Sequence, residues 1–323
     1  MRAAVRELGR RVVATAHTWR SRLSGARVGC VLVYHGVADE TGDADREIVP
    51  AIAATLLESH VRLLSRRYRI VPPSAILDAV VRRRRGGRVP LALTFDDDLA
   101  SHVTHAAPLL RRRGVPAGFF LCGSMVAGAG GYWWEHLQES VDAGRLRPDD
   151  LPGATAEQVD AALAREPGAI SGLARIVEEL DPAARVTATA ALARHASPRR
   201  RLERDDVRSL VRDGFEVGFH TLRHDRLPPL DDARLEAAMS DGRRELEELA
   251  GVRLTTISYP HGRADARIGD AARAAGFTVG FVGGGARIGP GDEPLLLSRL
   301  SPTFETGGTV ALEIARYLRR RTA

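Results

Sequence analysis

Short apolar segments that alternate with amphipathic ones constrain the fold of this chain more than any other feature. Each apolar segment is five to seven residues long and ends near glycine, proline or a charged residue, so we interpret these segments as buried strands. They cover residues 30–34, 89–95, 117–121, 215–219, 254–259, 277–281 and 295–300. Between them, apolar residues recur at helical spacing, as in Leu57, Val61 and Leu64. This alternation indicates an α/β fold with a parallel sheet.

One long segment departs from this alternation. Residues 124–201 contain an alanine-rich helical pattern and no convincing strand. We therefore predict a helical insertion at 124–201 that interrupts a single domain spanning residues 28–323. The alternation resumes after the insertion, and one long helix is predicted over residues 231–249.

The first 27 residues predict a basic amphipathic helix. Val5, Leu8 and Val12 recur at steps of three and four residues, with arginines between them. These arginines interrupt the apolar core of ~7–15 residues that a secretory signal needs, so the expected location is cytoplasmic. A basic helix of this type can lie on an anionic membrane surface, so peripheral membrane contact through residues 1–24 is one interpretation. Packing of the helix on its own domain is the other.

Charge and cysteine content argue against nucleic-acid binding and against a cysteine-based scaffold. The net charge is +6, but all 47 basic residues are arginines, scattered among 41 acidic residues. Because no stripe of basic residues with interleaved aromatic residues is present, we expect no nucleic-acid partner. Cys30 and Cys122 are too few for a disulfide framework or a four-thiolate zinc site, and reduced thiols are the simplest expectation.

Polar residues that can bind metals or exchange protons gather where the predicted strands end. The carboxyl ends of parallel strands form one rim of an α/β fold, so residues at these ends are expected to share one site. They are His35, Asp96, Asp97, Asp98, His220, His224, His261 and Arg299.

The spacing of two histidines suggests a metal site. His220 and His224 are four residues apart, which lets both imidazoles reach one ion. A neighbouring carboxylate supplies a third ligand and a second carboxylate supplies a base, and such a set leaves coordination positions open for water and substrate. We expect a divalent metal, with Zn²⁺ favoured and Co²⁺, Ni²⁺ or Fe²⁺ also suited to these ligands. The alternative is that residues 96–98 only cap a helix that begins near residue 100.

The order of three motifs resembles the polysaccharide deacetylases, which form carbohydrate esterase family four and share the NodB-homology domain. The motifs are Thr94-Phe95-Asp96-Asp97, then His220-Thr221-Leu222-Arg223-His224, then Ser258-Tyr259-Pro260-His261-Gly262. Residues 32–37, 114–120 and 214–218 fit the same group. The resemblance covers roughly residues 28–123 and 202–305, with the helical segment between them as an insertion.

This resemblance implies a deformed (β/α) barrel and a metal-dependent hydrolase that removes acetyl groups from an N-acetylated or O-acetylated carbohydrate. The implied metal ligands are Asp97, His220 and His224. Asp96 would act as the general base while metal-bound water attacks the acetyl carbonyl, and the backbone N–H of His261 would help to hold the oxyanion. Tyr259 and Pro260, in the same motif as His261, are expected to contact the substrate.

Two positions depart from the family pattern. The family often ends with Leu-x-His, whose histidine is the acid, but Arg299 occupies that position here, and a guanidinium cannot act as an acid near neutral pH. Ser258 stands where an arginine usually steadies the base. We therefore hypothesise that Arg299 orients Asp96 through a charge-assisted pair.

The proton donor must then be another residue, and His261 or His35 is the candidate. His261 could instead contribute only its backbone, and His35 could only support the catalytic residues. Asp98 replaces a usual glycine and either crowds the metal or turns the chain.

Two tryptophans open the insertion. Trp133 and Trp134 could stack on sugar rings in a glycan groove, or they could anchor the insertion to the barrel. Two other functions stay open: a catalytically impaired relative that binds a glycan, and a metal-dependent hydrolase of another C–N bond. The sequence predicts no specific sugar, linkage or oligomeric state.

Overall fold

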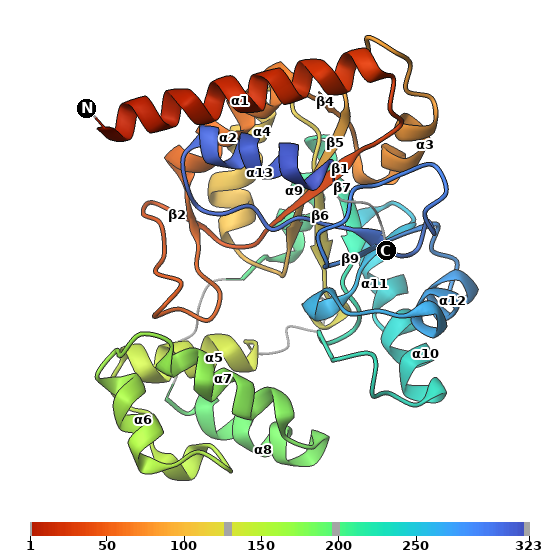
Figure 1. The fold of residues 1–323 in the computed structure, drawn as a ribbon. Coiled ribbons are helices and arrows are strands. Elements are labelled where there is room, and N and C mark those ends of the chain that lie inside the picture. The colour runs from red at the N-terminus through yellow and green to blue at the C-terminus, as the bar shows by residue number, and fades with distance from the viewer. Residues whose placement is uncertain (1, 126–130, 196–200, 320–323) are drawn as a thin grey trace. The chain divides into compact units, whose positions relative to one another are not determined.

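The computed structural model describes residues 2–125, 131–195 and 201–319, which fall into two compact units (Figure 1). The first unit comprises residues 1–39, 52–128 and 201–323, and the second comprises residues 40–51 and 129–200. Each unit has a hydrophobic core of its own.

Eight parallel strands in the first unit form a sheet that nearly closes into a barrel (Figure 1). Seven of them follow one another in the sheet in chain order, and the short β4 (Arg69–Ile70) pairs with the start of β5. Leu300, just after β10, pairs with Leu32 of β1, so the two edges of the sheet meet there. The seven strands are β1 (Cys30–Tyr34), β5 (Pro90–Asp96), β6 (Gly118–Leu121), β7 (Glu216–Phe219), β8 (Thr256–Ser258), β9 (Val279–Val282) and β10 (Leu297–Ser298).

This topology confirms the predicted deformed (β/α) barrel. All seven predicted strands are present, and each ends within two residues of its predicted carboxyl end. Neighbouring residues of a strand divide between two apolar clusters: Leu32 and Phe119 belong to one, and Val31 and Phe120 belong to the other. Because side chains alternate across a strand, the clusters mark the two faces of the sheet, and both faces are buried.

Helices cover the outside of this sheet (Figure 1). Apolar residues of α2 such as Leu57 and Leu64 join the cluster that contains Leu32, so this cluster lies between sheet and helices. The helices of the first unit are α1 (Arg2–Ser24), α2 (Ala54–Arg67), α3 (Ile76–Val81), α4 (Ala107–Arg112), α9 (Arg204–Arg212), α10 (Asp232–Ser240), α11 (Arg243–Ala250), α12 (Ala266–Ala274) and α13 (Gly307–Tyr317). Shorter elements are β2 (Val37–Ala38), which pairs with β3 (Ile52–Ala53), a π-helical turn at His102–Ala106, and 3-10 turns at Pro73–Ala75, Gly123–Met125 and Pro260–Gly262.

The single helix predicted over residues 231–249 is wrong. The chain forms two helices there, α10 and α11, separated at Asp241 and Gly242. Gly242 has a φ of 73°, which lies outside the helical region. A Cβ at Gly242 would lie 2.8 Å from the Cα of Gly123, so a contact with a distant loop requires glycine at this break.

The second unit is helical, as predicted for the insertion. It contains α5 (Trp133–Asp142), α6 (Ala156–Leu163), α7 (Ala169–Glu179) and α8 (Pro182–Ala193), with a 3-10 turn at Pro148–Asp150. Residues 40–51 also belong to this unit, which differs from their predicted place in the barrel domain. The N–H of Ile48 donates to Oε1 of Gln138 at 3.1 Å, and the N–H of Gly168 donates to the carbonyl of Asp45 at 2.7 Å.

The basic helix predicted at the N-terminus is present as α1. It packs against α13 of its own unit (Figure 1), as one of the two interpretations expected. Peripheral membrane contact through residues 1–24 stays a prediction. Among the helices that the structure describes, none combines the length and the apolar character needed to cross a bilayer.

Candidate metal centre and active site

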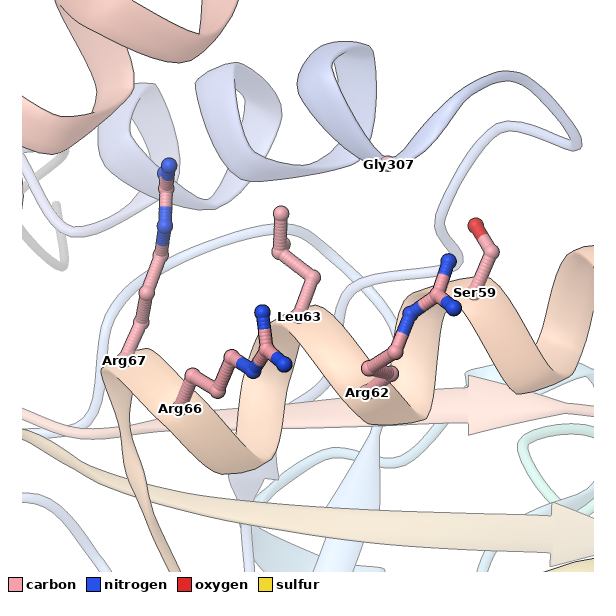
Figure 2. A pocket seen from close by; sticks show the side chains of 6 residues that line it. All are labelled: Ser59, Arg62, Leu63, Arg66, Arg67 and Gly307. Atoms are coloured by element: carbon pink, nitrogen blue, oxygen red, sulfur yellow. The ribbon is translucent and has the colours of Figure 1, made fainter.

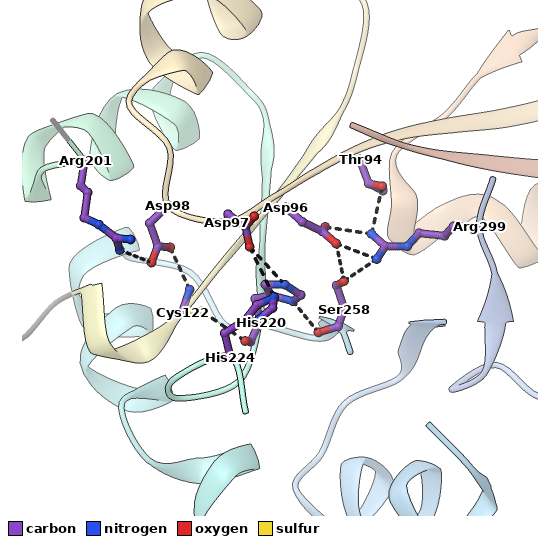
Figure 3. Close-up of polar contacts among 10 residues, drawn as sticks. All are labelled: Thr94, Asp96, Asp97, Asp98, Cys122, Arg201, His220, His224, Ser258 and Arg299. Carbon is purple, nitrogen blue, oxygen red and sulfur yellow. Dashed lines mark hydrogen bonds and ion pairs between the residues drawn. The ribbon is translucent and has the colours of Figure 1, made fainter. Parts of the chain in front are cut away.

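The predicted rim residues follow the carboxyl ends of the strands. Asp96 is the last residue of β5, His220 follows β7, Arg299 follows β10 and His35 follows β1. Since the strands are parallel, these ends lie along one edge of the barrel. Figure 3 shows the polar contacts that result.

Asp97, His220 and His224 form one cluster of metal-ligand type. One ligand atom of each lies within 4.8 Å of the others. Oδ1 of Asp97 lies 3.6 Å from Nε2 of His220 and 3.6 Å from Nε2 of His224 (Figure 3). Two atoms bound at ~2.1 Å to one tetrahedral Zn²⁺ would be roughly 3.4 Å apart. Donor types and spacing therefore fit a shared divalent cation.

The protonation of the two imidazoles also suits a metal. Nδ1 of His220 lies 2.8 Å from the carbonyl oxygen of Ser258. Because a carbonyl oxygen can only accept, Nδ1 carries the proton and Nε2, which faces Asp97, presents its lone pair. Burial lowers the pKa of His220 and lowers the pKa of His224 well below its usual value, which favours the neutral, metal-binding form of both.

Backbone strain is concentrated around this cluster. Among the described residues, five residues other than glycine have a positive φ, and four of them belong to the rim: Asp97 (74°), Thr221 (64°), His224 (60°) and His261 (58°). Each such conformation costs on the order of 1–3 kcal/mol, and the β-branched Thr221 tolerates it least. Local hydrogen bonds hold the loop, since the carbonyl of Thr221 accepts from the N–H of Gly123 at 3.0 Å. Strain of this kind is typical of functional sites.

Asp96 and Arg299 form a buried, bidentate ion pair. Nη1 of Arg299 donates to Oδ1 of Asp96 at 2.8 Å, and Nη2 donates to Oδ2 at 2.6 Å (Figure 3). Both residues are at most 4% exposed. Burial alone would raise the pKa of Asp96, but the positive charge of Arg299 holds it well below its usual range. The pair that we hypothesised from the sequence is therefore present, and its part in catalysis stays a prediction.

Two hydroxyl groups complete this network. The hydroxyl of Ser258 donates to Oδ2 of Asp96 at 2.9 Å and accepts from Nη2 of Arg299 at 2.7 Å. The hydroxyl of Thr94 accepts from Nη1 of Arg299 at 3.2 Å. From the sequence, Ser258 was expected only as the replacement of an arginine, and Thr94 was not expected in the site. Thr94 precedes Asp96 by two residues on β5, so strand periodicity places both on one face and could have identified it.

His35 and His261, the candidate proton donors, differ in exposure. His35 is half-buried, and burial lowers its pKa to about 4 despite the opposing charge of Asp96. His261 is exposed, and its ring centroid lies 4.7 Å from that of His224, a metal-ligand candidate. Both rings are thus near the cluster, and His261 is the more exposed of the two.

The remaining motif residues lie in less exposed positions. Tyr259 is 0% exposed within the main core, and a Cβ at Gly280 would lie 2.7 Å from its hydroxyl. Pro260 is buried in the following turn. In this conformation the ring of Tyr259 presents no surface to a ligand, and substrate contact through this segment stays a prediction.

Asp98 supports the loop rather than the metal cluster. Its Oδ1 accepts from the backbone N–H of Cys122 at 2.9 Å, and its Oδ2 lies 3.7 Å from Nη1 of Arg201 (Figure 3). These contacts tie the loop after β5 to the end of β6 and favour the interpretation that Asp98 fixes the turn. Cys122 and Cys30 are buried and form no disulfide bond.

Trp133 and Trp134 lie at the start of α5 in the second unit. Trp134 is 7% exposed and stacks on Tyr132, with ring centroids 4.1 Å apart. Trp133 meets Trp134 edge to face and packs in part against the core of this unit. Packing within the helical unit accounts for Trp134, and glycan contact by either ring stays a prediction.

Comparison with known sequences identifies one family. Residues 83–148 and 149–280 match the family described as polysaccharide deacetylase. The matched ranges make up more than half of the chain and contain all three metal-ligand candidates, and they end before Arg299. One curated protein, a gellan lyase of Bacillus sp, is 41% identical over 56 residues, which are 17% of this chain and only 2% of that protein.

Solved structures share the fold. A deacetylase of Streptococcus pyogenes, PplD, in complex with acetate, is 12% identical with a TM-score of 0.60 over 90% of this chain and 98% of that chain. A de-N-acetylase of Aggregatibacter actinomycetemcomitans is 20% identical with a TM-score of 0.59 over 90% of this chain and 100% of that chain. IcaB of Ammonifex degensii is 19% identical with a TM-score of 0.56 over 90% of this chain and 97% of that chain.

Proposed function

Because this chain belongs to the polysaccharide deacetylase family, we propose that it is a metal-dependent hydrolase that removes acetyl groups from an N-acetylated or O-acetylated carbohydrate. Carbohydrate deacetylation is the activity of the family. The observation that carries the metal-dependent mechanism is the cluster of Asp97, His220 and His224 beside the ion pair of Asp96 and Arg299.

The cluster supplies the cation site of this proposal. Asp97, His220 and His224 would hold Zn²⁺, or Co²⁺, Ni²⁺ or Fe²⁺, which when bound lowers the pKa of a water ligand and polarises a carbonyl. The carbonyl of Ser258 fixes the ring of His220 through Nδ1, so that Nε2 points towards this position.

Asp96 is the proposed base, and its hydrogen bonds indicate which oxygen accepts the proton. An ionised carboxylate has about four acceptor sites, two on each oxygen. Arg299 and Ser258 occupy both sites of Oδ2, whereas Arg299 occupies only one site of Oδ1. Oδ1 therefore has a site left for a proton taken from water, and Arg299 keeps the carboxylate ionised and oriented near neutral pH.

His261 is the preferred proton donor to the leaving group in this proposal. It is exposed and adjacent to His224, where a substrate could reach it. His35 is the weaker candidate, because a pKa near 4 keeps its ring unprotonated at neutral pH. The backbone N–H of His261 is proposed to help stabilise the oxyanion.

Metal content of the purified protein tests the cation site. We expect about one equivalent of a divalent metal in the parent protein and a large loss in a variant with Asp97→Ala and His220→Ala. Asp225→Asn is the matched control, since it removes an exposed carboxylate next to His224 and should retain metal. Equal metal content in all three proteins would contradict the proposed ligands.

Acetate release tests the reaction itself. N-acetylated and O-acetylated glycans incubated with the metal-loaded protein should yield acetate, and His261→Ala should lower kcat while the metal content is unchanged. Metal binding without acetate release from any glycan would favour the impaired glycan-binding relative. Release of a product from small amides alone would favour a hydrolase of another C–N bond.

A further inference from the structure

A cavity lies on the outside of the barrel, between α2 and the start of α13. It has a volume of about 330 Å³ and is lined by Ser59, Arg62, Leu63, Arg66, Arg67 and Gly307 (Figure 2). We call these six residues the arginine pocket. Five of them come from α2 and one from the first turn of α13. None has a part in the proposed deacetylase reaction.

The arginine pocket brings three positive charges together on one helix. Arg62 and Arg66 are one helical turn apart on α2, so their charges repel one another, and Arg67 follows Arg66. Within the described part of the chain, no carboxylate pairs with Arg62 or Arg66. Glu58, one turn before Arg62, pairs instead with Arg113 at 2.5 Å. The side chains of Arg62 and Arg66 are exposed, so both guanidinium groups are available to an anion from solvent.

The opposite wall adds to this positive field. Gly307 is the first residue of α13, an eleven-residue helix whose N-terminus carries a partial positive charge. A Cβ at Gly307 would lie 3.7 Å from both Leu63 Cδ1 and Ser59 Oγ, so the glycine lets the cavity reach the helix backbone. In Figure 2 the side chains of Arg62, Leu63 and Arg67 extend from α2 towards α13.

Hydrogen bonds beneath the cavity fix its shape. Nε2 of His60 lies 2.8 Å from the carbonyl oxygen of Glu305, just before α13, and must donate to it. Burial lowers the pKa of His60, so the ring is neutral and its Nδ1 accepts from the hydroxyl of Tyr34 at 3.3 Å. Arg67 is held from the other side, since its Nη2 donates to the hydroxyl of Thr15 in α1 at 2.7 Å. The two walls are thus positioned before any ligand arrives.

We propose that the arginine pocket binds a phosphate-bearing group. Guanidinium groups match phosphate oxygens with paired hydrogen bonds, and helix N-termini favour the same anion. The volume falls at the lower end of small-molecule sites, roughly 300–1,000 Å³, so the pocket has room for a group larger than a phosphate ion. Leu63 and Ser59 would contact the remainder of the ligand. The phosphate can belong to a soluble molecule or to a lipid headgroup.

Binding measurements with two probes test this proposal and separate the two sources. The probes are inorganic phosphate and vesicles of phosphatidylcholine with phosphatidylglycerol. The test variant is Arg62→Gln with Arg66→Gln, and the control variant is Arg84→Gln with Arg85→Gln, which removes two exposed arginines elsewhere. Circular dichroism and acetate release should be unchanged in both variants.

We expect the test variant to bind at least one probe about tenfold or more weakly than the parent, with a weaker dependence of affinity on salt, and the control to bind as the parent does. Loss for free phosphate alone indicates a soluble ligand, and loss for vesicles alone indicates a headgroup. Absence of binding of both probes to the parent protein, or equal binding by the test and control variants, would overturn the proposal.

Discussion

Replacing Arg299 with methionine should lower the free energy of unfolding, because it removes one partner of the buried ion pair with Asp96. Methionine keeps apolar bulk but removes the two hydrogen bonds to Asp96 of 2.8 Å and 2.6 Å, together with those to Thr94 and Ser258. Asp96, only 2% exposed, would be left as a buried carboxylate without its cation. Loss of one partner of a buried pair costs about 3–5 kcal/mol, a large share of the ~5–15 kcal/mol that stabilises a typical domain.

The loss of stability in Arg299→Met should be larger at neutral pH than at acidic pH. In the parent protein the pKa of Asp96 lies below its unfolded value of ~3.9, so the stabilisation by the pair is present above that pH and is lost as the pH falls through the folded pKa. In Arg299→Met, burial is no longer opposed by Arg299 and the pKa of Asp96 should rise above the unfolded value. Protonation then relieves the buried charge, so the deficit in stability should be largest at pH 7 and smaller near pH 4.5.

Urea unfolding of four proteins at both pH values measures these effects. The proteins are the parent, Arg299→Met, Asp96→Asn and the double variant. Because the two residues interact directly, the double variant should be less destabilised than the sum of the single variants, by on the order of 1–3 kcal/mol at pH 7. Additive losses within about 0.5 kcal/mol, together with a deficit that does not change with pH, would refute this account. Arg299→Met should also lower kcat, since its Asp96 loses its fixed orientation.

Other positions give simpler tests. Gly242→Ala should lower the free energy of unfolding by more than Gly251→Ala in urea titrations, since both glycines have a positive φ but only Gly242 has a Cβ position within 2.8 Å of Gly123; equal losses would exclude the close approach as the cause. His102 is fully buried and its pKa is lowered to about 3, so acidification from pH 6.5 towards pH 3 should destabilise the parent more than His102→Phe, and parallel stability curves would contradict this. Chelation with EDTA should lower the Tm of the parent but leave that of Asp97→Asn unchanged, as measured by differential scanning calorimetry, whereas an equal shift in both would indicate metal bound elsewhere.

The strands could be predicted because strands of this fold have a recognisable sequence pattern. Strands buried on both faces give unbroken apolar runs, and the rim gives polar residues where each run ends, as in β5 before Asp97. The break between α10 and α11 could not be predicted this way, because it depends on the close approach of Gly123 to Gly242. The place of residues 40–51 in the second unit likewise depends on contacts across the chain, such as that of Ile48 with Gln138.

The site residues that belong to a sequence motif could be predicted. Those whose role depends on contacts with residues of other strands were harder to predict. The spacing of His220 and His224, with Asp97 at the end of another strand of the same rim, identified the ligand cluster that the structure assembles. The missing arginine before Tyr259 led to the hypothesis that Arg299 pairs with Asp96. No local pattern indicated that Ser258 would bridge these two charges, because that contact requires the geometry of two strands at once.

The position of Arg299 links the orientation of the base to the closure of the barrel. Its backbone N–H donates to the carbonyl of Val282 at 2.8 Å, and the N–H of the next residue, Leu300, donates to the carbonyl of Val31 at 2.9 Å. The bridge between Leu300 and β1 therefore joins the last strand to the first within one residue of the guanidinium that holds Asp96. An arginine at the position of Ser258, in the third motif, would lie on β8, between β7 and β9. Its position would not depend on the junction of β10 with β1. Here Arg299 lies one residue from the junction of β10 with β1, so we expect the orientation of the base to depend more on closure of the barrel than it would with an arginine on β8.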